Sequence, residues 1–366
     1  MKTSDFNYNL PQELIAQKPA EPRDSSRLMV VDKKNKNIEH KIFTDIVNYF
    51  QKGDLLVWNN SKVFKARLFG QLISATGRIL RDHDNPIEIF LVRPMENTGV
   101  WKVLARPGKH VQAGVKIVFA KDFYCGAIIK ETDGTILVQF SDDENIVRQK
   151  ANQYGHIPIP PYVKDEPHEL EIYQTIYANK DKEGSVAAPT AGFHFTDQVV
   201  EKLKAKGVEF ADVTLHVGLG TFLPVKSERI EDHTMHSEWI EVLEETVEKI
   251  NLAKSEGRRV TAVGTTTVRT LEGVACFGSE PAVYKLSGRR QHKLRSYKGD
   301  INIFIKPGFE FQIVDAMITN FHLPKSTLLM LASAFAGNRE FMLECYKSAV
   351  DNNYRFYSFG DGMFIY

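Results

Sequence analysis

Cysteine is scarce in this 366-residue chain, and long hydrophobic runs are missing. Its three cysteines, Cys125, Cys276 and Cys345, are far apart and form no CxxC pair, which argues against a disulfide framework or a thiolate zinc site. No run of 18 apolar residues occurs, and the start, MKTSDFNYNLPQE, has no apolar core of signal-peptide length. We therefore expect a soluble protein of the reducing cytoplasm with no membrane partner.

Net charge and nucleotide-binding motifs are lacking as well. Lys plus Arg number 47 against 46 Asp plus Glu, so a surface for a polyanion would have to be local. The absence of a GxxxxGK[ST] loop and of a GxSxG elbow argues against NTP hydrolysis and serine esterase chemistry. The segment GLGTF offers Gly218 and Gly220 without the third glycine of a dinucleotide fingerprint, and indicates either close backbone approach to a ligand or a plain tight turn.

Two patterns of secondary structure alternate along the chain. Residues 67–150 contain short β-type runs such as IEIFLV and VKIVFA, separated by turn residues, which predict a small β-barrel or sandwich. Strand and helix alternate after the proline-rich HIPIPPYVK, with helices expected at 196–207, 239–257 and 265–277 and strands at 301–305, 311–318 and 354–366. The pattern predicts an α/β fold: one α/β domain with a mixed or parallel sheet, formed by 1–66 and 151–366, and a small β-barrel domain inserted at 67–150.

Four polar segments lie at expected strand ends or helix starts. They are AAPTAGFHFT (187–196), HVGLGTF (216–222), GTTTVRT (264–270) and TNFHLPKST (319–327). Ligands bind beyond the carboxyl ends of strands in open α/β sheets, and helix N-termini there attract anions. Any one segment alone indicates helix capping. Four together, three of them with a histidine, favour a ligand site.

Two further kinds of segment allow more than one interpretation. HTMHSE contains His233, His236 and Glu238, which could bind zinc, act as acid and base, or form structural hydrogen bonds. The other segments are basic, and either hold RNA phosphates or form solvated surface. Their cations are Lys285, Arg289, Arg290, Lys293, Arg295 and Lys298 in 284–299, and Arg23, Arg27, Lys62, Lys65 and Arg67 near the expected domain junction.

Read together, the segments closely resemble the S-adenosylmethionine:tRNA ribosyltransferase-isomerase family of the queuosine pathway. The likeness runs nearly end to end, through GDLLVWNNSKVFKARLFG, GSVAAPTAGFHFT, TLHVGLGTFLPV, HTMHSE, VGTTTVRTLE and ITNFHLPKSTLLMLASAFAG. The chain departs from the family pattern at GDINIFIKPGFEF, where Lys306 and Phe309 replace aromatic residues, and at Phe193, where Leu is usual.

The resemblance implies an α/β domain with an inserted barrel and a defined reaction. The ribosyl part of S-adenosylmethionine moves onto the aminomethyl-deazaguanine wobble base of a tRNA with a GUN anticodon. It rearranges to the epoxycyclopentanediol of epoxyqueuosine, and adenine and methionine leave. S-adenosylmethionine is a consumed co-substrate, and neither another cofactor nor a metal is expected.

This chemistry requires proton transfers and a cation or helix start for the methionine carboxylate. We expect the proton transfers from His194, His216, His236, Glu238 and Asp361. The expected substrate-binding residues are Arg27, Arg67, Thr190, Gly218, Gly220, Thr265, Thr266, Arg269, Asn320, His322 and Lys325. Two competing interpretations are a zinc hydrolase that uses His233, His236 and another histidine, and a non-catalytic RNA-binding protein.

Overall fold

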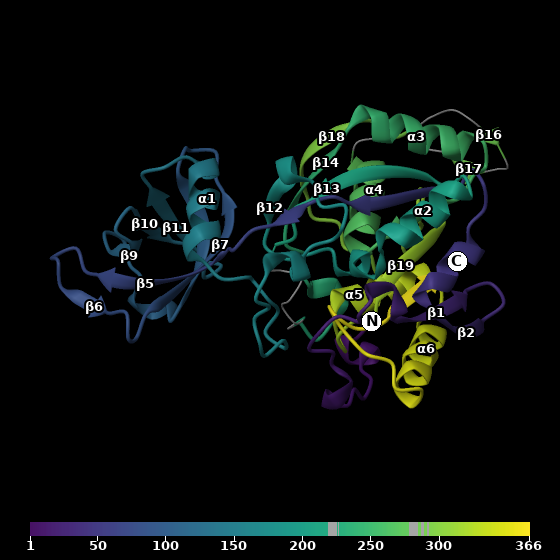
Figure 1. Cartoon of the computed structure of the whole chain (residues 1–366), viewed down its shortest axis with the longest axis horizontal. Coiled ribbons are helices and arrows are strands. Elements are labelled where there is room, and N and C mark those ends of the chain that lie inside the picture. Colours follow the sequence, from purple (N-terminus) through teal and green to yellow (C-terminus); the bar gives the residue numbers. More distant parts are fainter. Residues whose placement is uncertain (219–224, 226, 278–284, 287–288, 291–292) are drawn as a thin grey trace.

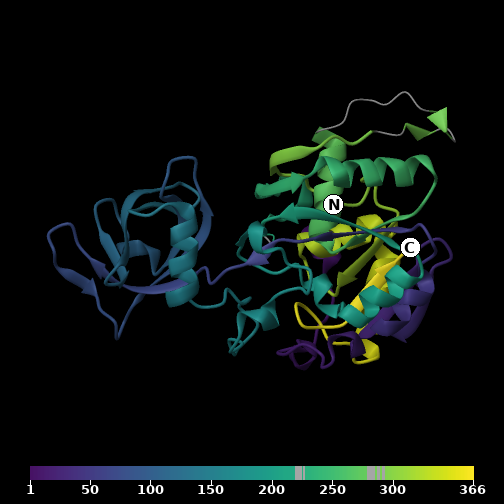
Figure 2. The same ribbon diagram turned by 45° about the horizontal axis from the view of Figure 1, so that its top comes forward.

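A computed structural model describes residues 1–218, 225, 227–277, 285–286, 289–290 and 293–366. A β-barrel stands at one end of the molecule, joined by two chain segments to a larger body in which helices cover a mixed sheet (Figure 1). The turned view shows the same separation of barrel and main body (Figure 2). The fold class expected from the sequence is confirmed.

The main sheet has nine strands in the order β18-β14-β13-β3-β15-β19-β20-β1-β2. The strands are β1 Arg27–Asp32, β2 Asn37–Ile42, β3 Leu55–Asn59, β13 Glu209–Leu215, β14 Glu238–Val242, β15 Val260–Val263, β18 Tyr297–Ile301, β19 Ala316–Asn320 and β20 Gly362–Ile365. The central strands β13, β3, β15 and β19 are parallel, so their carboxyl ends share one edge. Because β14 and β20 run antiparallel to β13 and β19, they begin at that edge, and β18 ends there.

Helices cover both faces of this sheet, because successive strand residues point to opposite sides. On β3, Leu55 and Val57 pack into one core with α3, α4, α5 and α6, whereas Leu56 and Trp58 pack into another with α2 and the 3-10 helix Phe43–Tyr49. The helices are α2 Asp197–Ala205, α3 Glu244–Ser255, α4 Thr265–Phe277, α5 Thr327–Phe335 and α6 Arg339–Asp351. The sheet therefore lies between two layers of helices.

The barrel contains β5 Arg67–Ile73, β6 Ile79–Arg81, β7 Ile87–Pro94, β8 Val100–Arg106, β9 Lys116–Ala120, β10 Phe123–Lys130 and β11 Ile136–Phe140. Pairing of β5 with β9 closes the order β5-β7-β8-β11-β10-β9, and β6 pairs with β5 outside the ring. Helix α1, Glu144–Tyr154, follows and packs Val147 and Ala151 into the barrel core. The sequence boundaries at 66/67 and 150/151 stay a prediction, and α1 runs across the second.

Several expected elements have different bounds. The helix expected at 239–257 begins only at Glu244, because residues 238–242 pair with β13 and β18 as β14. The strands expected at 301–305 and 311–318 are β18, which ends at Ile301, and β19, which begins at Ala316. Of the last expected strand, Gly362–Ile365 forms β20 and Phe356 makes one isolated bridge with Ile15, because turns and bends occupy 357–360 between them. Two short pairs, β4 Lys62–Val63 with β12 Glu183–Ser185 and β16 Lys285–Leu286 with β17 Arg289–Arg290, complete the described strands.

None of the described helices is both long enough and apolar enough to cross a membrane.

Candidate active site

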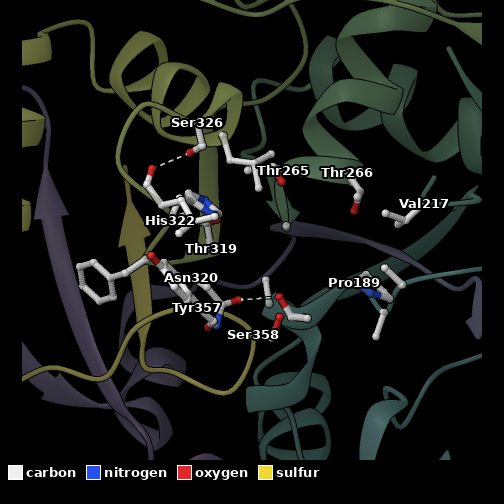
Figure 3. Close-up of a pocket in the computed structure, with 18 of the residues that line it drawn as sticks. Pro189, Val217, Thr265, Thr266, Thr319, Asn320, His322, Ser326, Tyr357 and Ser358 are labelled. Atoms are coloured by element: carbon white, nitrogen blue, oxygen red, sulfur yellow. Dashed lines mark hydrogen bonds between the residues drawn. The ribbon is translucent and has the colours of Figure 1, made fainter. Parts of the chain in front are cut away.

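The four polar segments meet at the carboxyl edge of the main sheet, where they line a cavity. This first cavity has about 710 Å³ of empty space, part of it open to solvent. Val217 follows β13, Thr265 follows β15, and Asn320 ends β19. Figure 3 shows Thr265 and Thr266 from the start of α4, Asn320 and His322 from β19 and its end, and Tyr357 and Ser358 from the segment before β20 around one common space. Thr190 also lines this cavity.

Helix α4 points its N-terminus at the first cavity. Gly264 joins β15 to the helix with φ of +88°, a left-handed conformation that glycine adopts without strain, and its N–H donates to Ile318 O at 2.7 Å. The first N–H groups of a helix have no partner within the helix, so they are available to a ligand. The hydroxyl oxygen of Thr266 is buried and has no hydrogen-bond partner in the described part of the chain. This end of the cavity therefore offers donors to an anionic or polar ligand.

His194 lies behind the cavity and supports Asn320. The Asn320 amide nitrogen lies 3.3 Å from His194 Nε2, and His194 Nδ1 lies 2.8 Å from the hydroxyl of Ser26. Because an amide nitrogen only donates, Nε2 accepts and Nδ1 carries the proton that is donated to Ser26. The Asn320 carbonyl oxygen accepts from Thr190 Oγ1 at 3.3 Å, which fixes the amide further. Burial, and then the charges of two arginines, lower the pKa of His194 to about 3, so its imidazole is neutral near pH 7.

His322 lines the first cavity directly. Its Nε2 lies 2.9 Å from the hydroxyl of Thr319, and its backbone N–H donates to Tyr346 Oη at 3.0 Å. Burial lowers the pKa of His322 to about 3, so it too is neutral near pH 7. This side chain can therefore exchange a hydrogen bond with a ligand, and it is a weak base.

The start of α5 differs from the sequence expectation. Ser326 is the N-cap, whose hydroxyl accepts from Leu329 N at 3.2 Å and donates to Leu323 O at 2.7 Å. Pro324 therefore lies before the helix, in a turn in which Lys325 has φ of +59°. Lys325 is exposed, and the first cavity is lined by its neighbours Leu323, Ser326 and Leu328 instead.

A second cavity adjoins the first and shares Leu328 with it. It lies beyond the starts of β14 and α4, and His233, His236, Glu238 and Arg269 line it. Glu238 and Arg269 are 5% and 6% exposed and form a buried ion pair through Glu238 Oε2 and Arg269 Nη1. Gly218 N–H donates to the other oxygen of Glu238 at 3.3 Å. Three residues expected from sequence, His236, Glu238 and Arg269, thus come together here.

The remaining expected catalytic residues lie outside both cavities. The His216 ring stacks on Trp239 with centroids 4.9 Å apart, and burial, followed by the charge of Arg148 on α1, lowers its pKa to about 4. Asp361 is 1% exposed, and its oxygens accept from the backbone N–H groups of Arg27 at 3.0 Å and Arg355 at 2.7 Å. These contacts give Asp361 a structural role in joining β1 to the segment before β20.

Several expected cations also contact protein groups. The guanidinium of Arg27 donates to Asn352 O and lies over the Tyr354 ring, and that of Arg67 pairs with Glu88 at 2.8 Å. Arg23 donates to three backbone carbonyls, of Glu171, Ile172 and Gln174. Lys62 pairs with Glu183 at 3.0 Å and Lys298 with Glu241 at 3.4 Å. Gly220, most of 284–292 and the side chains at 285, 286, 289 and 290 lie outside the described part of the chain.

Sequence reasoning missed three residues of the first cavity: Tyr162, Tyr357 and Ser358. Tyr162 Oη lies 2.7 Å from Ser358 Oγ, and the rings of Tyr162 and Tyr357 lie 4.6 Å apart. Tyr357 has φ of +71°, which is rare for a bulky side chain and common at functional sites. Their place in the cavity results from the contact between 157–163 and the C-terminal segment. No local sequence pattern encodes that contact.

No three His, Cys, Asp or Glu side chains of the described residues are grouped so that they could hold a metal ion. His233 and His236 do share the second cavity, with Phe304 in contact with His233. The expectation that the protein needs no metal stays a prediction.

Comparisons with known proteins show the family of this chain and agree with its fold. A family model described as queuosine biosynthesis protein matches residues 3–365. The chain is 49% identical over 366 residues to the S-adenosylmethionine:tRNA ribosyltransferase-isomerase of Thermotoga petrophila and 50% identical to that of Thermosipho melanesiensis, and covers 100% of both. A crystal structure of S-adenosylmethionine tRNA ribosyltransferase from Thermotoga maritima superimposes with a TM-score of 0.54 and 39% identity, over 99% of this chain and 100% of that one. The chain therefore belongs to the queuosine biosynthesis family that contains these ribosyltransferase-isomerases, and like them it is an enzyme.

Proposed function

We propose that this enzyme transfers and isomerises the ribosyl part of S-adenosylmethionine onto the aminomethyl-deazaguanine wobble base of tRNA, with a GUN anticodon in the acceptor. The product is epoxyqueuosine, and adenine and methionine are released. The S–C5′ bond, the bond from adenine to the ribose and one C–O bond of the ribose ring break. A bond to the aminomethyl nitrogen, a C1′–C5′ bond that closes the cyclopentane ring and a second C–O bond of the epoxide form. C5′ and the amine each lose one proton and the leaving adenine takes up one, so one proton is released overall. No oxidant or reductant takes part.

One observation carries the proposal: the polar segments that resemble the family converge on two cavities that share Leu328 at one strand edge. The first cavity combines the α4 start, an unpartnered Thr266 hydroxyl and the fixed amide of Asn320. These groups suit the sugar and base of an adenosyl group, which present hydroxyls and ring nitrogens. Tyr162 and Tyr357 add aromatic surface for the base.

Three histidines take different roles in the proposed reaction. A sulfonium acidifies its neighbouring C5′–H, and a histidine near the place where the two cavities meet is suited to remove that proton. His236 is exposed, lines the second cavity and is our candidate for this base. His194 acts as a positioning residue, since it contacts Asn320 and not the cavity. His322 supplies a neutral imidazole that can hydrogen-bond the substrate.

Single-turnover release of adenine tests this assignment. Wild-type enzyme with S-adenosylmethionine and the acceptor tRNA is expected to release adenine and methionine in equal amounts, and His236→Ala to lose adenine release by at least about a hundredfold. His168→Ala, at an exposed histidine that lines neither cavity, is the control and should keep the wild-type rate. Activity that survives a strong chelator agrees with a metal-free reaction, whereas loss that zinc restores would support the hydrolase interpretation.

A further inference from the structure

The two edges of the Arg269 guanidinium differ in their contacts. Its Nη1 is paired with Glu238, whereas Nε and Nη2 are buried and have no hydrogen-bond acceptor among the residues that the structure describes. Those two nitrogens form the side of the guanidinium that binds both oxygens of a carboxylate at once. A buried donor without a partner is unfavourable, and more so when it is charged. The arrangement therefore points to a ligand that supplies the missing acceptor.

The surroundings of Arg269 indicate the class of that ligand. The second cavity has about 460 Å³ of empty space including the part open to solvent, and apolar side chains such as Met235, Ile303 and Leu331 form much of its wall. Glu238 places a negative charge beside the guanidinium, which disfavours a dianionic phosphate and suits a zwitterion with an ammonium group. A carboxylate, an ammonium and a flexible apolar chain together describe an α-amino acid.

We propose that the second cavity is the subsite for the amino-acid part of S-adenosylmethionine, with its carboxylate bound by Nε and Nη2 of Arg269. This inference rests on the proposed function and divides the co-substrate between the two cavities. The adenosyl group occupies the first cavity, and the methionyl chain passes Leu328 into the second, since that residue lines both. The C5′ carbon then lies at the junction, within reach of a base in the second cavity.

Decarboxylated S-adenosylmethionine tests the subsite, because it lacks only the carboxylate. Wild-type enzyme should prefer S-adenosylmethionine in kcat/KM by about a hundredfold, the value of a charged bidentate hydrogen bond. Arg269→Gln should remove this preference by weakening only the natural co-substrate. Arg259→Gln is the matched control, since Arg259 pairs with Asp54 just before β15, at the opposite edge of the sheet, and should keep the full preference.

The outcomes separate the two proposals. Absence of adenine release in wild type contradicts the proposed function, whereas release with an undiminished preference in Arg269→Gln overturns the subsite alone. A higher KM for tRNA at an unchanged KM for S-adenosylmethionine would identify a phosphate site and also overturn it. If Arg269→Gln does not fold, binding to wild type decides: L-methionine should bind at least about tenfold more tightly than L-methioninol, which has no carboxylate, and equal binding refutes the proposal.

Discussion

At the scale of single residues, two buried threonine hydroxyls can be compared, one at a cavity and one inside a strand. Thr266 Oγ1 and Thr261 Oγ1 are both buried, and neither has a hydrogen-bond partner among the described residues. Thr266 lines the first cavity, whereas Thr261 lies inside β15 and is 0% exposed. An unpartnered hydroxyl at a cavity is available to substrate, and one in a strand interior only destabilises the fold.

Replacing each threonine by valine, which has the same shape, tests this difference. Thr266→Val should lower kcat/KM for S-adenosylmethionine about tenfold, the value of one lost hydrogen bond, with stability unchanged or slightly higher. Thr261→Val should leave kcat/KM unchanged. Steady-state kinetics and thermal unfolding of both variants provide the measurement, and equal kinetics for the two would show that the Thr266 hydroxyl does not contact substrate.

His194 gives a pH prediction because its folded pKa, about 3, lies below the ordinary value of 6.5. As pH falls below 6.5 the unfolded chain takes up a proton that the folded protein refuses, so stability is lost progressively down to about pH 3. By pH 5 this residue should cost about 2 kcal/mol. Urea unfolding at pH 8 and pH 5 should therefore show the difference between wild type and His194→Gln shifting by that amount in favour of the variant. A constant difference would mean that His194 is protonated in the fold.

Residue types in the sequence indicated many of the residues that line the candidate site, but they did not indicate the role of each residue. Thr190, Thr265, Asn320 and His322 were found because Gly, Thr and His clusters mark strand ends. Sequence could not separate His194, which supports Asn320 from behind, from His236, which lines a cavity. That difference is one of burial and contact, and nothing local to either residue encodes it.

At the scale of elements, the start of α5 forms part of the wall of the first cavity. Ser326 caps the helix and also bonds back to Leu323, so it fixes the turn in which Lys325 adopts a left-handed conformation. The next helix, α6, is capped in the same way by Asn338, whose side chain accepts from Phe341 N at 2.9 Å and lies away from both cavities.

The two caps provide a matched pair of substitutions. Ser326→Ala and Asn338→Ala should each lower stability by about 1 kcal/mol, because each removes one N-cap hydrogen bond. Only Ser326→Ala should also lower kcat/KM, by about tenfold or more, because the cavity wall then shifts. Urea unfolding and steady-state kinetics check both. A similar loss of activity in Asn338→Ala would show that general destabilisation is the cause.

Element types were predicted well where one pattern dominated a segment. The helix 265–277 agrees with α4, and Thr196 caps α2 as its sequence suggested. The error at 239–257 arose because Ile240 fits one helical face together with Leu243, Val247 and Ile250, although it belongs to the strand β14 between β13 and β18. Pairing with distant strands, which a local period does not contain, decides such cases.

At the scale of the whole molecule, a groove marks the junction of barrel and main body. It lies between β5, β7 and β8 of the barrel and the proline-rich 158–161, with about 1550 Å³ of empty space including the part open to solvent. Arg106 and Lys164 line it and are exposed, unlike the engaged guanidinium groups of Arg23 and Arg27. We expect tRNA phosphates to bind here.

Salt dependence of tRNA binding tests this surface. The logarithm of affinity should fall with the logarithm of salt concentration, with a slope of about −0.7 for each single-strand phosphate contact. The double variant Arg106→Gln with Lys164→Gln should raise KM for tRNA and flatten this slope, with KM for S-adenosylmethionine unchanged. Lys202→Gln with Lys204→Gln on α2 is the control and should match wild type. A slope equal to wild type in the groove variant would place the RNA elsewhere.

The presence of a barrel and an α/β body could be predicted from the sequence, since β runs without helical period fill one segment and strand–helix alternation fills the rest. The placing of two cavities next to each other could not be predicted. It depends on β14, β18 and β20 meeting the parallel strands at one edge, and that order of strands is set by long-range packing.

The most direct test of the central claim is the mass of the modified nucleoside. Enzyme, S-adenosylmethionine and tRNA carrying the aminomethyl-deazaguanine wobble base are incubated, and the digested tRNA is analysed by liquid chromatography and mass spectrometry. We predict the epoxide-bearing nucleoside, with adenine and methionine formed in equal amounts. An unchanged wobble nucleoside, with folded enzyme and intact tRNA, would contradict the account.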